Sequence, residues 1–109
     1  MTRDEVEKEV RDLAKQVQER LDSIFAKVPE PRDSSPLNQA GLRNGFQIVE
    51  EYLNHNEIGL AFDHLTYMII EPEVPVTLDE IVKLKSVAEH LNVPDPSGRA
   101  RIMSRKARH

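Results

Sequence analysis

The sequence predicts an all-α protein, a small bundle of about four helices with a proline-rich join after the first helix and a mobile basic tail. Two observations carry this prediction. Apolar residues recur at steps of three and four, so that they fall on one side of a helix. Prolines separate these stretches, and proline ends a helix because it lacks a backbone N–H. The 109 residues suit one domain, so we predict a single helical domain over residues 1–96 and a flexible tail over residues 97–109.

The first helix is predicted to begin after Thr2. Thr2 and Glu5 form a capping box, in which the side chain of each residue accepts a hydrogen bond from the backbone N–H of the other. An apolar stripe follows and consists of Val6, Val10, Leu13, Val17, Leu21, Ile24 and Val28. Such a stripe faces either the core of a bundle or the same helix of a second copy, and both roles remain open. The helix is ended by Pro29, Pro31 and Pro36.

The second helix is predicted over about residues 37–55. Its apolar face consists of Leu42, Phe46, Ile48, Val49, Tyr52 and Leu53. Gly41 and Gly45 each weaken this helix by up to about 1 kcal/mol relative to alanine. They also let a neighbouring backbone approach, and we expect close packing there.

The third helix is predicted over residues 57–70, with Asn56 as its N-cap. Its join to the second helix is only a few residues long, which makes the two helices an antiparallel hairpin. A second capping box, Thr77 with Glu80, begins the fourth helix, and Asn92 caps its C-terminus. The expected core face of the fourth helix consists of Leu78, Ile81, Leu84, Ala88 and Leu91.

The third helix is apolar on two sides. The face that docks on the bundle consists of Ile58, Ala61, Phe62, Leu65 and Ile69. A second row lies opposite, so the helix is either buried on both sides or carries an exposed strip for a partner. Tyrosine is enriched at interfaces, and acidic side chains favour a basic partner. The predicted partner-binding residues are Glu57, Leu60, His64, Tyr67, Glu71 and the loop acid Glu73.

The net charge of −4 hides an asymmetry along the chain. Residues 98–109 hold Arg99, Arg101, Arg105, Lys106 and Arg108 and no acid. The other ten lysines and arginines stand against 19 acids, so residues 1–97 carry a formal charge of −9. An acidic body repels phosphates and speeds the encounter with basic proteins. We therefore expect a basic protein partner and no direct binding of nucleic acid. Only the basic tail would favour a nucleic acid.

The composition of the sequence disfavours secreted, disulfide-bonded and membrane-spanning proteins. It has no cysteine, which excludes disulfides and thiolate metal sites and fits a reducing compartment. The first ten residues are acidic, unlike a signal peptide, and no apolar run approaches the roughly 20 residues of a membrane span. We expect a cytoplasmic protein that does not enter a membrane.

The sequence offers no set of residues typical of catalysis. It has neither a nucleophile elbow nor a phosphate-binding glycine loop. His64 and Glu71 lie two helical turns apart, and a metal site needs at least a third ligand that no motif supplies. The neighbouring acids Glu50–Glu51 and Asp79–Glu80 point in different directions on a helix and are expected on a solvated face. We predict no enzyme activity, no cofactor and no metal.

Part of the chain resembles a known family. The residues concerned are Asn56-Glu57-Ile58-Gly59-Leu60-Ala61, His64-Leu65, Ile70-Glu71 and Pro75-Val76-Thr77. In this order they resemble the MafI family of immunity proteins, small helical proteins of bacterial polymorphic-toxin and contact-dependent growth inhibition systems. The resemblance implies a cytosolic protein that binds one cognate toxin domain, often a nuclease, and blocks its active site or holds it inactive. It covers about half of the chain.

A second function class is a homodimeric structural or regulatory module. In this alternative the apolar stripe of the first helix is a dimer seam, and the basic tail anchors the dimer to an acidic surface. The run has fewer than four heptads and ends at Pro29, which limits the coiled-coil interpretation. The sequence allows a monomer or a homodimer.

Overall fold

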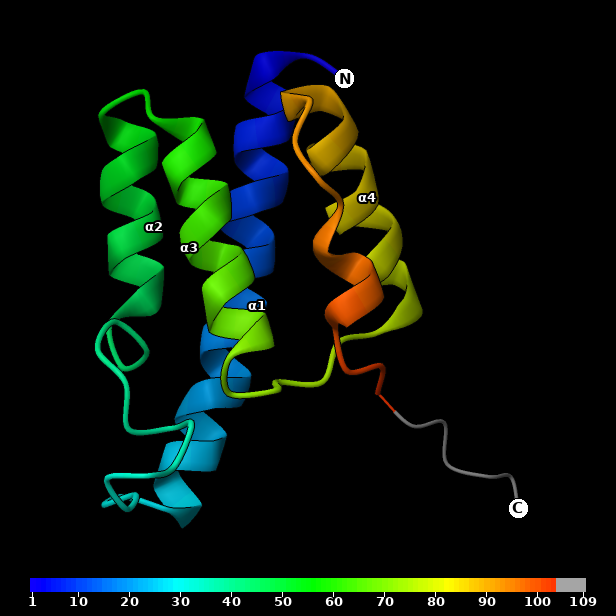
Figure 1. Cartoon of the computed structure of the whole chain (residues 1–109). Coiled ribbons are helices and arrows are strands. Elements are labelled where there is room, and N and C mark those ends of the chain that lie inside the picture. Colours follow the sequence, from blue (N-terminus) through cyan, green and yellow to red (C-terminus); the bar gives the residue numbers. More distant parts are fainter. Residues whose placement is uncertain (104–109) are drawn as a thin grey trace.

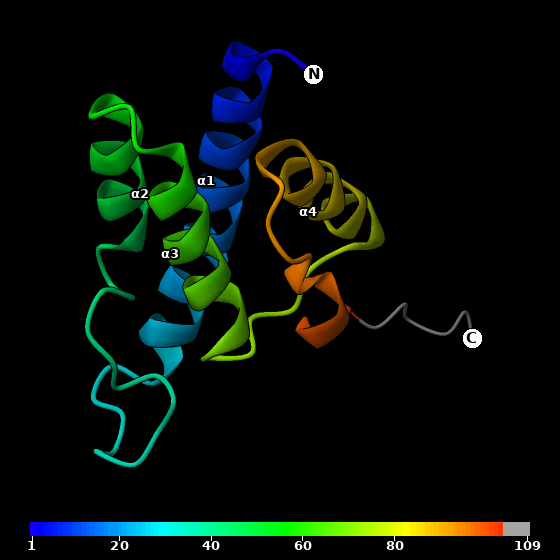
Figure 2. The same cartoon turned by 45° about the horizontal axis from the view of Figure 1, so that its top comes forward.

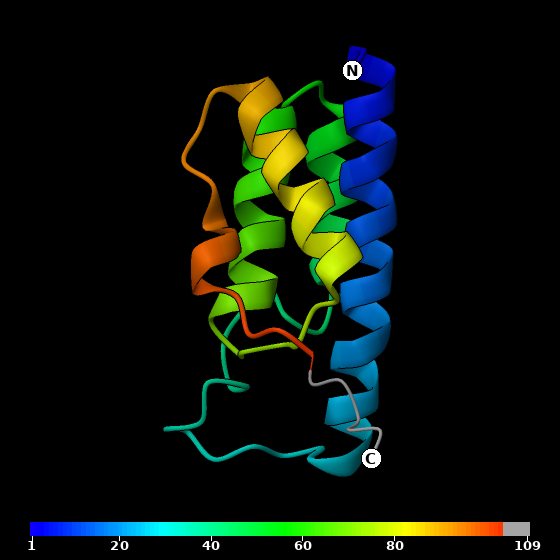
Figure 3. The same cartoon turned by 90° about the vertical axis from the view of Figure 1, so that its right-hand side faces the viewer.

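Residues 1–103 are described by the computed structural model, and Figure 1 shows their arrangement. Within these residues the chain forms four α-helices, namely α1 (Arg3–Lys27), α2 (Gly45–Asn54), α3 (Ile58–Ile70) and α4 (Leu78–Leu91), followed by the 3-10 helix η1 (Pro96–Arg99). The long helix α1 contacts α2, α3 and α4, and Figure 3 shows it running along the whole bundle. The predicted all-α bundle is confirmed for the described part of the chain.

Helix α1 is held at its start by the predicted capping box and along its length by the core. The Thr2 hydroxyl accepts from the Glu5 N–H at 3.1 Å, and the Glu5 carboxylate accepts from the Thr2 N–H at 2.7 Å. The stripe is buried at Val6, Val10, Leu13, Val17 and Leu21, half-buried at Ile24 and exposed at Val28. The buried part of the stripe is therefore bundle core within one chain, the first of its two open roles.

Helices α2 and α3 form the predicted antiparallel hairpin, as Figure 2 shows. They pack closely at Gly45, where an added Cβ would lie 2.6 Å from Sδ of the fully buried Met68. The prediction that Asn56 caps α3 is wrong, because Asn56 has a left-handed φ of 64°. Its side-chain oxygen instead accepts from Arg3 at 2.6 Å, and Glu57 takes the N-cap position.

The predicted start of the second helix is also wrong, since α2 begins at Gly45 and not near residue 37. Gly41 has a φ of +83°, which breaks the helical path. Four consecutive carbonyls there are held by side chains of other helices. Ala40 O accepts from Tyr67, Gly41 O from His64, and Leu42 O and Arg43 O both accept from Gln18. Distant side chains thus replace the backbone N–H groups that a helix would offer.

Gln18 of α1 also caps α2 from outside that helix. Its side-chain Oε1 accepts from the Phe46 N–H at 2.8 Å. The N-cap residue Asn44 makes no such capping hydrogen bond with its own side chain.

We expect Gln18→Ala to lower the free energy of unfolding by about 2 kcal/mol, because Arg43 O and the Phe46 N–H lose their partner and Leu42 O keeps only the long bond from the Gly45 N–H at 3.4 Å. Gln16→Ala is the matched control, since Gln16 is exposed on the same helix and its side chain makes no hydrogen bond within residues 1–103. It should change stability by less than about 0.5 kcal/mol. Urea unfolding of both variants is the measurement, and equal midpoints would contradict the capping role.

Helix α4 has the predicted capping box at Thr77 and the predicted C-cap at Asn92, which is left-handed, but its core face differs. Leu78 is 60 % exposed, and Val87 is buried in addition to Leu84 and Ala88. The reason is Glu80, which is 4 % exposed and faces α1. Residues two apart point to nearly opposite sides of a helix. The predictions of a buried Leu78 and a solvated Glu80 are therefore both wrong.

The C-terminal segment is ordered further than predicted. Pro96 is buried, η1 packs against α4, and Ala100 packs against the core. Val76 then forms a single parallel bridge to Ile102, in which the Val76 N–H donates to Arg101 O and the Met103 N–H donates to Val76 O. Residues 97–103, which were predicted to belong to a flexible tail, thus contact the rest of the protein. The tail residues Arg105, Lys106 and Arg108 lie outside the described residues.

No helix within residues 1–103 combines the length and the apolar character needed to cross a membrane.

Candidate protein-binding surface

The second row of α3 is exposed at its ends and covered in its middle. Leu60 is 43 % exposed, and Glu57, Glu71 and Glu73 are exposed as well. The half-buried residues are His64 and Tyr67. The row is thus exposed at some positions and half-buried at others. The side chains in the middle are covered by the connection between α1 and α2. The name α3 strip is used below for Glu57, Leu60, Asp63, His64, Tyr67, Glu71 and Glu73.

Two side chains of the α3 strip hold the cover in place. The Tyr67 hydroxyl donates to Ala40 O at 2.6 Å, and His64 Nε2 lies 3.0 Å from Gly41 O. The two rings are neighbours, with centroids 5.3 Å apart and planes tilted by 39°. Burial raises the pKa of Tyr67, and the nearby Glu71 carboxylate raises it further. The phenol therefore stays protonated and remains a hydrogen-bond donor throughout the neutral range.

Asp63 belongs to the same surface, although it was not among the predicted residues. It is exposed, three residues after Leu60 and four before Tyr67, and this spacing places the three side chains on one side of the helix. The spacing alone could have found it.

The acids of the α3 strip lie in a part of the chain that has no cationic residue of its own. Within residues 1–103, none of Glu57, Asp63, Glu71 and Glu73 forms an ion pair. Five acids of other helices are paired, and these are Glu7 with Arg3, Asp12 with Lys8, Glu50 with Arg11, Glu80 with Arg20, and Asp79 with Lys83. Residues 44–82 contain no lysine or arginine. The α3 strip is therefore a source of uncompensated negative potential.

Glu71 and Glu73 are placed against the ordinary preference of a helix. Both follow the C-terminal end of α3, where the helix dipole favours positive charge. Glu73 has a left-handed φ of 56°, in a turn where its N–H donates to Ile70 O at 3.2 Å. These carboxylates therefore do not stabilise the helix that they follow.

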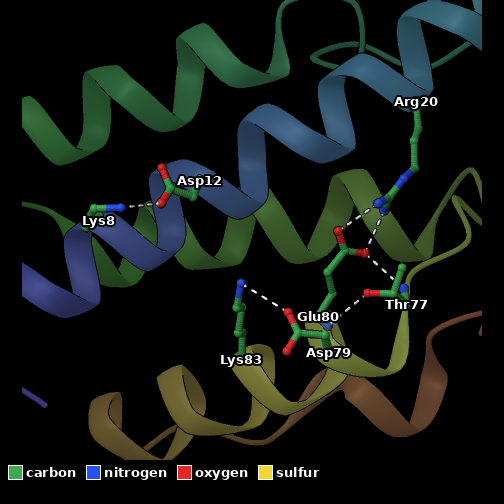
Figure 4. A network of polar contacts seen from close by, with 7 residues as sticks. All are labelled: Lys8, Asp12, Arg20, Thr77, Asp79, Glu80 and Lys83. Carbon is green, nitrogen blue, oxygen red and sulfur yellow. Dashed lines mark hydrogen bonds and ion pairs between the residues drawn. The ribbon is translucent and has the colours of Figure 1, made fainter.

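A polar network on another face, shown in Figure 4, contrasts with the α3 strip. Arg20 of α1 donates to both carboxylate oxygens of Glu80, each at 2.7 Å. This pair lines an open groove of about 630 Å³ between α1 and the start of α4. Arg20 and Glu80 satisfy each other's charge, so this pair leaves little to bind a charged ligand. Among the described residues, no group of three or more histidines and acids could hold a metal ion.

Comparison of the chain with known protein families, with curated proteins and with solved structures finds no match. The function is therefore argued from the charge and geometry of the α3 strip.

Proposed function

We propose that this protein is an immunity protein that neutralises a cognate bacterial toxin domain by binding it through the α3 strip. One observation carries the proposal, namely that four carboxylates of the α3 strip have no cationic partner within residues 1–103 and lie in a stretch, residues 44–82, that contains no lysine or arginine. Such a surface favours a basic partner, and its role is binding without catalysis. A nuclease suits it, because a nuclease presents positive charge to the phosphates of its substrate.

The arrangement gives each part of the α3 strip a role in binding. The carboxylates steer a basic domain and raise the association rate. Leu60 and the ring of Tyr67 offer apolar contact area at the centre. A cation of the partner would also relieve the repulsion between the α3 dipole and Glu71. The same cation, once covered, is no longer available to a nucleic acid.

The first test of this proposal uses the toxin encoded beside the gene. The C-terminal domain of the large secreted protein expected from the adjacent upstream gene is produced in cells with and without this chain. Growth should stop in its absence and resume in its presence. An adjacent operon of metabolic enzymes, or a toxin domain that this chain leaves active, would overturn the proposal.

A second test measures association kinetics with charge-reversed variants. Asp63→Lys combined with Glu71→Lys should lower the association rate constant at least about tenfold at low salt, and added salt should shrink the difference by screening. Glu19→Lys combined with Glu89→Lys changes the net charge equally on exposed acids of α1 and α4. This control should keep most of the wild-type rate. Equal losses in both variants would remove the α3 strip from the interface.

A further inference from the structure

The connection between α1 and α2 is unusually long for such a small bundle. It runs over residues 28–44, which is 17 residues without helix or strand. Connections of more than about 12–15 such residues are uncommon in compact domains, and ordered ones usually carry function.

Residues 36–44 of this connection, here called the 36–44 segment, are held by contacts from several directions. Their carbonyls accept from Tyr67 and His64 of α3 and from Gln18 of α1. Leu42 is fully buried in the core. Arg43 stacks on the Phe25 ring at 4.0 Å. The segment is therefore irregular in shape but fixed in place.

The 36–44 segment lies against the α3 strip and leaves part of its own surface free. Tyr67 and His64, which belong to the α3 strip, are the residues that contact Ala40 and Gly41. Exposed residues of the segment include Pro36, Asn38 and Ala40. A partner that covers the α3 strip would therefore meet the segment as well.

We propose that the 36–44 segment is the second half of the partner-binding surface, and that Tyr67 and His64 are positioning residues that set its shape. This inference rests on the proposed function and names the same partner, a basic toxin domain. Arg43 is exposed, but its guanidinium stacks on Phe25 and donates to Pro29 O, and the other exposed residues of the segment, Pro36, Asn38, Ala40 and Asn44, are uncharged. The α3 strip supplies attraction to any basic domain, and the segment distinguishes the cognate one by shape. Because the segment is already ordered, binding needs little further ordering of the chain.

The contact is tested with Ala40→Arg, a large cation placed on an exposed position of the segment. We expect the Kd for the neighbouring toxin domain to rise at least about tenfold, through steric hindrance and repulsion. Ala26→Arg is the matched control, because Ala26 is exposed on α1, and it should bind like wild type. Equal Kd values for the two variants, with tight wild-type binding, would overturn the inference and leave the proposed function standing. Absence of wild-type binding would overturn both.

The positioning role is tested with Tyr67→Phe, which keeps the ring and removes only the hydroxyl that donates to Ala40 O. Backbone amides of the 36–44 segment should exchange hydrogen about five- to tenfold faster, and the toxin should bind more weakly. Tyr52→Phe is the control, since the Tyr52 hydroxyl makes no hydrogen bond within residues 1–103, and it should leave both readouts unchanged. Unchanged exchange in Tyr67→Phe would refute the positioning role without reference to any partner.

Discussion

Replacing Arg20 by methionine is expected to lower the free energy of unfolding by about 3 kcal/mol at neutral pH. Glu80 is 4 % exposed, and both of its carboxylate oxygens accept from Arg20. Arg20 also donates to Pro75 O at 3.2 Å. Methionine fills similar space but leaves the buried carboxylate without its main partner. The effect belongs at the low end of the range for broken buried pairs, because the Arg20 side chain keeps 25 % of its exposure.

The difference in the free energy of unfolding between wild type and Arg20→Met should become smaller at acidic pH. Burial alone raises the pKa of Glu80, but hydrogen bonds from the Arg20 side chain and the Thr77 backbone outweigh it and hold the pKa below its ordinary value of 4.5. As the pH falls below 4.5, the unfolded chain takes up this proton before the folded chain does. The stabilisation is thus complete above that pH and is lost as the pH falls through the folded pKa. In the variant, protonation relieves the unpaired buried charge instead.

Denaturant unfolding between pH 7 and pH 3 measures how the difference in the free energy of unfolding between the two proteins changes with pH. Lys8→Met serves as the control, because Lys8 pairs with Asp12 on the surface of α1 and should contribute little at any pH. If the difference in the free energy of unfolding between wild type and Arg20→Met stays constant with pH, the Arg20–Glu80 pair is not the origin of that difference.

Replacing Gly45 by alanine is expected to lower the free energy of unfolding by about 2 kcal/mol, against the intrinsic helix preference of alanine. The new Cβ would lie 2.6 Å from both Sδ and Cε of Met68. Met68 is fully buried, so its thioether cannot move away without disturbing the contact between α2 and α3. The steric penalty therefore exceeds the gain in propensity.

Gly59→Ala provides the matched comparison for Gly45→Ala. Gly59 is also near the start of a helix, but it is exposed and a Cβ there meets nothing within 4 Å. This variant should be more stable than wild type by about 0.5–1 kcal/mol. Thermal and urea unfolding of the two variants should shift in opposite directions. Two shifts of the same sign would contradict the close packing assigned to Gly45.

The α3 strip shows what a local pattern can and cannot predict about a site. Helical periodicity placed Leu60 and Glu71 away from the face that packs on the core, and both are exposed, whereas Tyr67 packs partly against the core. It did not indicate that Tyr67 and His64 are half-covered, because their cover is a segment more than 20 residues earlier in the chain.

Features that depend on neighbouring residues were determined by the sequence itself. The capping boxes at Thr2 and Thr77 each join residues three apart, and the stripe of α1 follows from the helical repeat. The tertiary structure decided the features that join distant residues. Gln18 holds Phe46 across 28 positions, and Arg20 draws Glu80 inward across 60. A buried polar group needs a hydrogen-bond partner, and the fold decides which residue lies close enough to be that partner. Local periodicity does not indicate which distant residue this is.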